Sequence, residues 1–183
     1  MGTADNLIRQ GAGPAEGAEG AAPPEHWRYT RHLEALAAAA AGGPEAGPDP
    51  DAADRAEAAA VAEVLRDPDP VMAESAVVTH LDRRAARLLD DPRFPAWARA
   101  LGAALGERAF PARRLREWAL LKAIGAGEPW SAEDLTGASD WCQRTAAQLL
   151  TSYEALGLLA ASARTRRVRN AAAGRLRRRS LTA

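Results

Sequence analysis

The sequence predicts an all-α protein, a short stack of antiparallel helices preceded by a disordered N-terminal tail. Alanine, the strongest helix former, occupies 46 of the 183 positions. Aromatic residues make up 5% of the chain, and valine and isoleucine are scarce, which argues against a β-sandwich or barrel. Glycine, proline and capping residues recur at short intervals between segments with helical spacing of apolar residues. Short helices with tight joints favour antiparallel neighbours stacked in sequence order.

The N-terminal part of the chain is expected to lie outside the folded core. Residues 1–24 consist mostly of glycine, alanine, proline and glutamate, and such a segment cannot offset an ordering cost of about 1–2 kcal/mol per residue. Residues 25–41 carry Trp27 and two leucines ahead of an alanine run, which predicts a helix. Because residues 42–50 are rich in proline and glycine, we expect them to be a linker. The helix is then an arm, which either docks on a partner or packs back on its own domain.

Residues 51–183 are expected to form one helical domain. Its first helix covers about 51–66 and ends at the sequence DPDP, in which Asp69 is placed to cap the next helix and Pro70 to begin it. A separate short helix is expected over about 82–89. The sequence therefore predicts three helices of this domain before the midpoint of the chain.

The second half of the domain continues this pattern of capped helices. Helices are expected to begin near Pro92 and Pro111, after Ser131 as a short turn, and after Ser139 as its cap. Two more helices complete the chain. The apolar faces of these helices predict a core that includes Trp97, Leu101, Trp118, Trp141, Tyr153, Leu156, Leu159, Val168, Ala172 and Leu176.

Charge is divided unevenly along the chain, although the net charge is zero. Residues 1–91 carry 8 basic and 17 acidic groups, whereas residues 92–183 carry 16 basic and 7 acidic groups. Eight arginines lie between Arg164 and Arg179, and no acidic residue follows Glu154. Either they bind phosphates or an acidic protein surface, or they form the solvated face of a terminal helix. The candidate binding residues are Arg144, Arg164, Arg166, Arg167, Arg169, Arg177 and Arg178, with Arg166, Arg169 and Arg177 expected to point outward.

The C-terminal part of the chain resembles a HEAT-like or leucine-rich-variant α-helical repeat. In such repeats a Leu-Leu-Ala helix precedes a Val-Arg-x-Ala-Ala helix. The first helix is matched by Leu156, Leu159 and Ala160, and the second by Val168, Arg169, Ala171, Ala172 and Leu176. The preceding helix, with Arg144, Ala146 and Ala147, resembles another such unit, and the whole is similar to repeat proteins of the actinobacterial type. This resemblance implies a stack in which each helix covers its predecessor.

Residues 111–170 also resemble a winged helix-turn-helix. The short second helix and its turn are matched by Ser131, Leu135, Gly137 and Ser139, and the end of the recognition helix by Leu156, Gly157, Leu158 and Leu159. In this alternative, residues 131–179 bind DNA, and base edges are read by Asp140, Gln143, Arg144 and Gln148. A β-hairpin after Leu159 would favour DNA binding, whereas another helix there favours the stack.

The chain offers little for catalysis, and we expect no enzyme activity, cofactor or metal. Its histidines, His26, His32 and His80, belong to no cluster with metal-ligand spacing, and no glycine-rich phosphate motif occurs. The one conceivable Ser/His/Asp set, Ser75, His80 and Asp82, has spacings that point the side chains apart on a helix. Cys142 is expected to be a small buried hydrophobe. No apolar run approaches the roughly 18 residues of a membrane span, so we expect a cytoplasmic protein with neither a membrane partner nor a small-molecule substrate.

These observations favour a non-enzymatic adaptor that holds an acidic protein partner with its concave face and basic C-terminal end. DNA binding is the alternative function. In the helical arm, Trp27 and Tyr29 are possible partner anchors, because Trp, Tyr and Arg dominate interface hot spots. We further expect Trp130, which follows Pro129 in a loop, to close the end of a groove.

Overall fold

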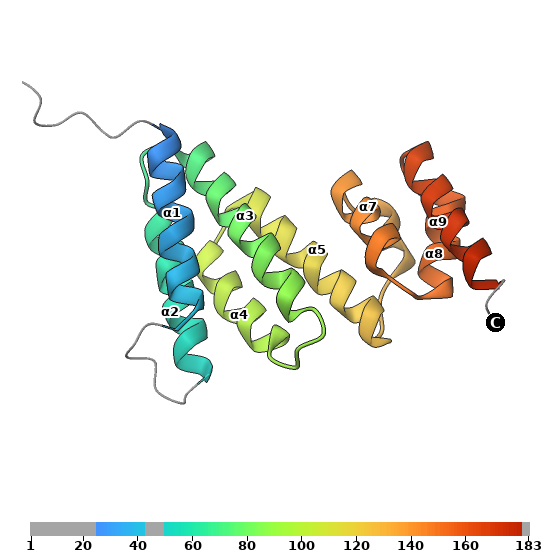
Figure 1. The fold of residues 1–183 in the computed structure, drawn as a ribbon, viewed down its shortest axis with the longest axis horizontal. Coiled ribbons are helices and arrows are strands. Elements are labelled where there is room, and N and C mark those ends of the chain that lie inside the picture. Colours follow the sequence, from blue (N-terminus) through green and yellow to red (C-terminus); the bar gives the residue numbers. More distant parts are fainter. Residues whose placement is uncertain (1–24, 43–49, 181–183) are drawn as a thin grey trace, which may run out of the picture.

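The computed structural model describes residues 25–42 and 50–180, which form nine α-helices and no strand. The helices follow one another along an elongated molecule, with α1 at one end and α9 at the other (Figure 1). Their bounds are Glu25–Ala40 (α1), Pro50–Val64 (α2), Pro70–Leu88 (α3), Phe94–Leu105 (α4), Ala109–Ala126 (α5), Ala132–Gly137 (α6), Asp140–Leu149 (α7), Tyr153–Ser162 (α8) and Arg166–Ser180 (α9). The predicted all-α stack is confirmed. The expected tail and most of the expected linker lie outside the described residues.

Most helices pack against the helix two places further along the chain. In one row α1 contacts α3, α3 contacts α5, α5 contacts α7 and α7 contacts α9. In a second row α2 packs on α4 and α6 packs on α8, but α4 and α6 share no extensive contact. The second row is therefore interrupted. The long helix α5 lies across the middle of the molecule and connects α1–α4 with α6–α9 (Figure 1).

The first helix, expected as an arm, is part of the stack. α1 packs on both α2 and α3, and its Leu36 is fully buried. Two groups of polar contacts fix its N-terminal half. The Tyr29 hydroxyl lies 2.9 Å from the hydroxyl oxygen of Thr79 on α3, and His32 Nε2 lies 2.9 Å from an Asp67 carboxylate oxygen. Several backbone and side-chain donors, with the backbone N–H of Asp69 first, hold the pKa of Asp67 below its usual range. The structure thus gives α1 a place inside the domain instead of outside it.

Capping residues set the helix boundaries largely as the sequence predicts. The Asp69 carboxylate accepts a hydrogen bond from the backbone N–H of Met72 at 3.0 Å, and Pro70 is the first residue of α3. The Ser139 hydroxyl accepts from the backbone N–H of Cys142 and donates to Glu117 of α5, at 3.1 and 2.9 Å. One boundary is wrong. The short helix expected over 82–89 is the continuation of α3, because no glycine or proline interrupts the chain before Leu88.

Most of the predicted core is buried, and one inward assignment is wrong. The buried members are Trp97, Leu101, Trp118, Leu156, Leu159, Val168 and Ala172, whereas Trp141 and Leu176 are partly buried against them. Tyr153 is 50% exposed. It is the first residue of α8, and its ring lies under the guanidinium group of Arg179, 4.9 Å from ring centre to guanidinium carbon, instead of facing the core.

A buried ionic cluster joins α2, α3 and α4. The carboxylate of Glu57 is fully buried and accepts hydrogen bonds from His80 Nε2 at 2.8 Å, Trp97 Nε1 at 3.0 Å and Arg84 Nε at 3.0 Å. Burial by itself raises the pKa of Glu57. The hydrogen bonds from His80 and Trp97 and the charge of Arg84 outweigh that effect, so the pKa of Glu57 lies below its ordinary value. Ionised Glu57 therefore ties three helices together.

A second polar cluster forms the junction between the two halves of the stack. Asp82 of α3 accepts hydrogen bonds from Trp118 Nε1 at 2.8 Å and from Arg114, both on α5. The Arg114 guanidinium carbon lies 3.7 Å from the ring centre of Trp141 on α7, and the rings of Trp118 and Trp141 meet edge to face at 5.3 Å. Burial raises the pKa of Asp82, and Trp118 and Arg114 reduce that rise. The junction thus depends on stacked rings and one shared carboxylate.

Candidate binding surfaces

Three arginines of the C-terminal cluster are used inside the fold. Arg169 Nη1 donates to the backbone oxygen of the residue that caps α8, at 2.6 Å. Arg175 donates to two backbone oxygens near the C-terminal end of α7, and Arg179 donates to the backbone oxygen of Thr151 at 2.7 Å. The last carbonyls of a helix lack intrahelical partners and carry the negative end of the helix dipole, so guanidinium groups stabilise them. The expectation that Arg169 points outward is therefore wrong.

Three other arginines form an exposed row that we call the basic ridge: Arg166, Arg167 and Arg177. They lie on the side of α9 opposite the buried Val168 and Ala172. Within the described residues, no hydrogen bond or ion pair involves the guanidinium groups of the ridge. The outward orientation predicted for Arg166 and Arg177 is confirmed. The ridge can therefore offer its donors to a ligand.

The remaining candidate arginines, Arg144, Arg164 and Arg178, are exposed but lie outside the ridge. Arg144 is exposed on α7, and Arg178 is exposed on α9. Arg164 Nε lies 3.8 Å from a carboxylate oxygen of Asp140, and both side chains are more than half exposed, 56% and 55%. Such a solvated pair contributes little stability. Arg164 is thus available to a partner at small cost.

The helix expected to read DNA bases in the winged-helix alternative cannot use its central residue. Gln143 of α7 is fully buried. Its amide nitrogen donates to the backbone oxygens of Leu135 and Thr136, at 3.1 and 2.7 Å, and its amide oxygen accepts from the backbone N–H of Arg164 at 2.8 Å. All three bonds join α7 to the segments that precede and follow it. The assignment of Gln143 as a base-reading residue is therefore wrong.

The position expected for a wing is helical. After Leu159, α8 continues to Ser162, and α9 begins at Arg166. Residues 160–180 contain no strand. Another helix at this place is the outcome that favours the stack over the winged helix.

Five large hydrophobic side chains of the described residues are exposed, and three of them bear on the candidate surfaces. Trp27 on α1 is 60% exposed, whereas Tyr29, the other possible anchor, is partly buried by its contact with α3. At the other end of the molecule Leu149 and Tyr153 are 46% and 50% exposed, beside the loop to which Arg179 binds. Helical spacing places Leu149 on the apolar face of its helix with Trp141, so the sequence predicts burial, and that assignment is wrong.

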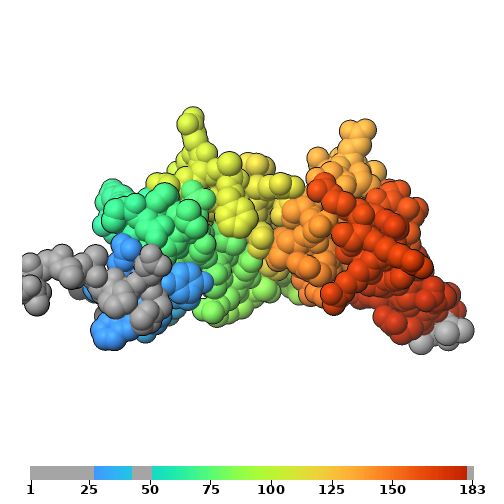
Figure 2. Space-filling view, turned by 90° about the horizontal axis from the view of Figure 1, so that it is seen from above, coloured from blue at the N-terminus to red at the C-terminus, as the bar shows by residue number. Residues whose placement is uncertain are grey.

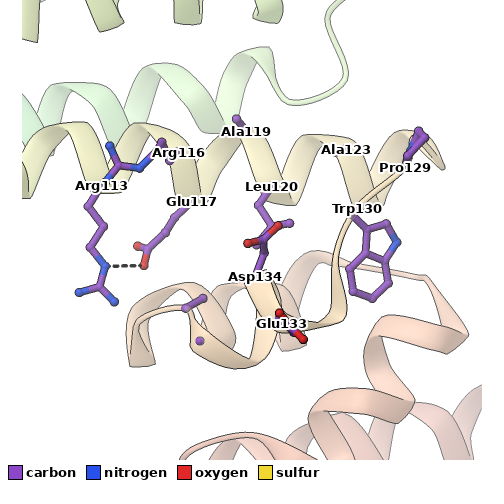
Figure 3. A pocket seen from close by; sticks show the side chains of 12 residues that line it. Arg113, Arg116, Glu117, Ala119, Leu120, Ala123, Pro129, Trp130, Glu133 and Asp134 are labelled. Atoms are coloured by element: carbon purple, nitrogen blue, oxygen red, sulfur yellow. Dashed lines mark hydrogen bonds and ion pairs between the residues drawn. The ribbon is translucent and has the colours of Figure 1, made fainter.

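A groove of about 600 Å³ lies between α5 and α6, as Figure 3 shows in detail. Its apolar wall includes Leu120, Ala123 and Trp130, and its charged lining includes Arg113, Arg116, Glu133 and Asp134. Trp130 lies in the connection that closes one end, as predicted (Figure 3). In the space-filling view the outline of the molecule dips between α5, in yellow, and α6, in orange (Figure 2). The charged groove residues were missed because only the tertiary placement of α6 beside α5 brings them together.

The polar side chains near the groove and in the core are held by hydrogen bonds to other residues of the fold. The Glu117 carboxylate is held by Ser139 at 2.9 Å and by Arg113 at 3.2 Å. In the expected Ser/His/Asp set, His80 binds Glu57 and Asp82 binds Trp118, so the three side chains do not converge. The described part of the chain contains no group of three or more His, Cys, Asp or Glu side chains that could hold a metal. This arrangement can hold a ligand by apolar contact and charge.

Cys142 is expected to resist thiol reagents in the folded protein. It is fully buried, and burial together with the charge of Glu117 raises the pKa of its thiol to about 12. A thiol with this pKa is almost entirely protonated at about pH 8, and the thiolate is the reactive form. Titration with an aromatic disulfide reagent should give no reaction in buffer and one thiol per chain in denaturant. Rapid modification in buffer would place Cys142 at the surface.

None of the helices in residues 25–42 and 50–180 is both long and apolar enough to cross a membrane. Comparison of the chain with protein-family models, with curated proteins and with solved structures finds no match. The function must therefore be inferred from the side chains themselves.

Proposed function

We propose that this chain is a non-enzymatic, cytoplasmic adaptor of the HEAT-like helical repeat type that holds an acidic protein partner at its C-terminal end. The observation that carries the proposal is the basic ridge. Arg166, Arg167 and Arg177 are exposed on one face of α9, their guanidinium groups have no partner in the described part of the chain, and no acidic residue follows Glu154 in the sequence. Arginine binds carboxylates in a bidentate manner, which suits an acidic protein surface.

Two further features support a protein partner over DNA. Leu149 and Tyr153 are exposed at the same end of the molecule, and apolar and aromatic contacts are typical of protein interfaces. Of the four polar side chains expected to read bases, Asp140, Arg144 and Gln148 are exposed on α7, but the central one, Gln143, is withdrawn into the core. The ridge alone would meet DNA only through phosphates, which gives affinity without sequence preference.

The proposal is tested by replacing the three ridge arginines with alanine. We expect the triple variant R166A/R167A/R177A to bind a glutamate-rich peptide roughly tenfold more weakly, because three exposed pairs at about 0.2–1 kcal/mol each are lost. Fluorescence anisotropy of the labelled peptide at low salt measures the affinity. The matched control R31A/R66A/R99A removes three exposed arginines elsewhere, and its affinity should change less than about twofold.

Two outcomes would contradict the acidic-partner proposal. One is a peptide that does not bind the wild type at low salt, or whose binding is weakened equally by the ridge variant and by the control variant. The other is duplex DNA that binds the wild type more tightly than the peptide does, with a salt dependence that flattens by about 0.9 per lost contact in the ridge variant. That second result would favour nucleic acid as the partner.

A further inference from the structure

A small crevice between α1 and α3 has a strongly basic wall. Its volume is about 110 Å³. The α1 side is lined by Leu33 and by alanines, which leave room because their side chains are short. The α3 side is lined by His80, Arg83, Arg84 and Arg87. On a helix these positions fall within one face, since residues three and four apart are neighbours.

The basic side chains of the crevice are unequally satisfied. Arg84 and His80 share a single carboxylate, that of Glu57, at 3.0 and 2.8 Å, through Arg84 Nε and His80 Nε2. Both are largely buried, with side chains 13% and 6% exposed. Arg83 and Arg87 are exposed, and within the described residues they make no hydrogen bond or ion pair. Three guanidinium groups therefore line one crevice, and within the described residues only that of Arg84 is paired with a carboxylate.

These arginines do not serve as caps for the neighbouring helix. α1 ends beside the crevice, and free carbonyls at a helix end attract cations. The backbone oxygens of Ala37 and Ala39 accept instead from the backbone N–H groups of Ala41 and Gly42, at 3.1 and 3.3 Å. Within the described residues, no arginine of α3 is hydrogen-bonded to α1. The excess positive charge on this face of α3 thus has no structural use in the described part of the chain.

We propose that this crevice binds a single phosphate group. A water molecule needs about 10–15 Å³ of such space, so about 110 Å³ has room for the oxygens of one phosphate group. Arginine forks match phosphate oxygens bidentately, and a dianion offsets the excess of guanidinium charge. Glu57 fixes Arg84 through Nε and leaves its terminal nitrogens for the ligand. The site is independent of the basic ridge on α9.

The ligand that carries the phosphate group is either the free ion or a small phosphate monoester, and two probes distinguish these two ligands. Inorganic phosphate and O-phosphoserine are titrated into the full chain, and binding is followed by the ring signals of His80 in NMR spectra. The two other histidines of the chain serve as internal references. We expect saturable shifts of the His80 signals alone. Tighter binding of O-phosphoserine assigns the site to a monoester, and equal or tighter binding of inorganic phosphate assigns it to the free ion.

The variant R83A/R87A removes the two exposed arginines of the crevice and leaves the buried cluster around Glu57 intact. We expect its affinity for the tighter-binding probe to fall at least tenfold. The matched control R166A/R177A removes two arginines from the ridge, and its affinity should stay within twofold of the wild type. The proposal is overturned if neither probe moves the His80 signals, or if both double variants weaken binding equally, which would indicate general charge attraction.

Discussion

Replacement of Glu57 with alanine is expected to lower the free energy of unfolding by about 3–5 kcal/mol. The substitution leaves the largely buried Arg84 without its carboxylate and the indole N–H of Trp97 without an acceptor. Urea unfolding followed by far-UV circular dichroism measures the loss. Glu63→Ala is the matched control, because Glu63 lies on the same helix with its side chain 70% exposed, and its effect should stay within about 0.5 kcal/mol. A loss below about 1 kcal/mol for Glu57→Ala would mean that water replaces the carboxylate.

The same cluster predicts how stability depends on pH. The pKa of Glu57 is lower in the folded protein than in the unfolded chain, so the stabilisation is complete above the unfolded pKa. It is lost as the pH falls through the folded pKa. The difference in unfolding free energy between the wild type and Glu57→Gln should therefore shrink from about pH 7 to about pH 3. A constant difference would show that the charge of Glu57 contributes nothing.

Replacement of Trp118 with alanine is expected to cost about 3–5 kcal/mol and to weaken the connection between the two halves. The indole is 3% exposed, donates to Asp82, and meets Trp141 of α7 edge to face. Its loss leaves a cavity where α5 meets α7, the only extensive contact between α5 and the C-terminal helices in the described part of the chain. The two halves should then unfold separately, so the unfolding midpoint measured by tryptophan fluorescence should differ from the one measured by far-UV circular dichroism.

Two controls separate these contributions of Trp118. Trp118→Phe keeps most of the ring but removes the donor to Asp82, so we expect a smaller loss of about 1–3 kcal/mol. Phe110→Ala removes a ring from the same helix at a position that is 50% exposed, and it should change the midpoint little. An unchanged midpoint in Trp118→Ala would contradict the role of this residue in the junction.

The parts of the fold that the sequence predicts are those that depend on neighbours in the chain. Asp69 and Ser139 cap their helices because a side-chain oxygen reaches a backbone N–H three residues ahead, and that geometry is local. The buried positions of Leu156 and Val168 likewise follow from helical spacing.

The errors concern residues whose environment depends on a distant helix. Arg169 carries the same charge as its neighbours, but only the placement of the end of α8 decides that it points inward. Gln143 is polar and was expected outside, yet its amide serves two backbone oxygens and one backbone N–H in the core. Spacing alone does not distinguish a polar side chain that faces solvent from one that satisfies buried backbone groups.

The candidate binding surfaces divide in the same way. The clustering of arginine at the C-terminus is visible in the sequence, so the basic ridge was predicted in part. The crevice at Arg83 and Arg87 was not, because it requires the alanines of α1 to lie opposite. The spacing His80, Arg83, Arg84, Arg87 along one helical face is the signal that marks it.

Because the second row of helices is interrupted between α4 and α6, the N-terminal and C-terminal helices are joined mainly by the packing of α5 on α7. Helix layers are about 8–10 Å apart, so α9 lies about 20 Å beyond α5, and a rotation of roughly 10° at the contact of α5 with α7 displaces α9 by roughly 3 Å. In the described part of the chain, no extensive contact in the second row opposes that rotation. The span from the crevice at Arg87 to the ridge at Arg177 is consequently set by a single joint, and a ligand long enough to touch both would fix its angle.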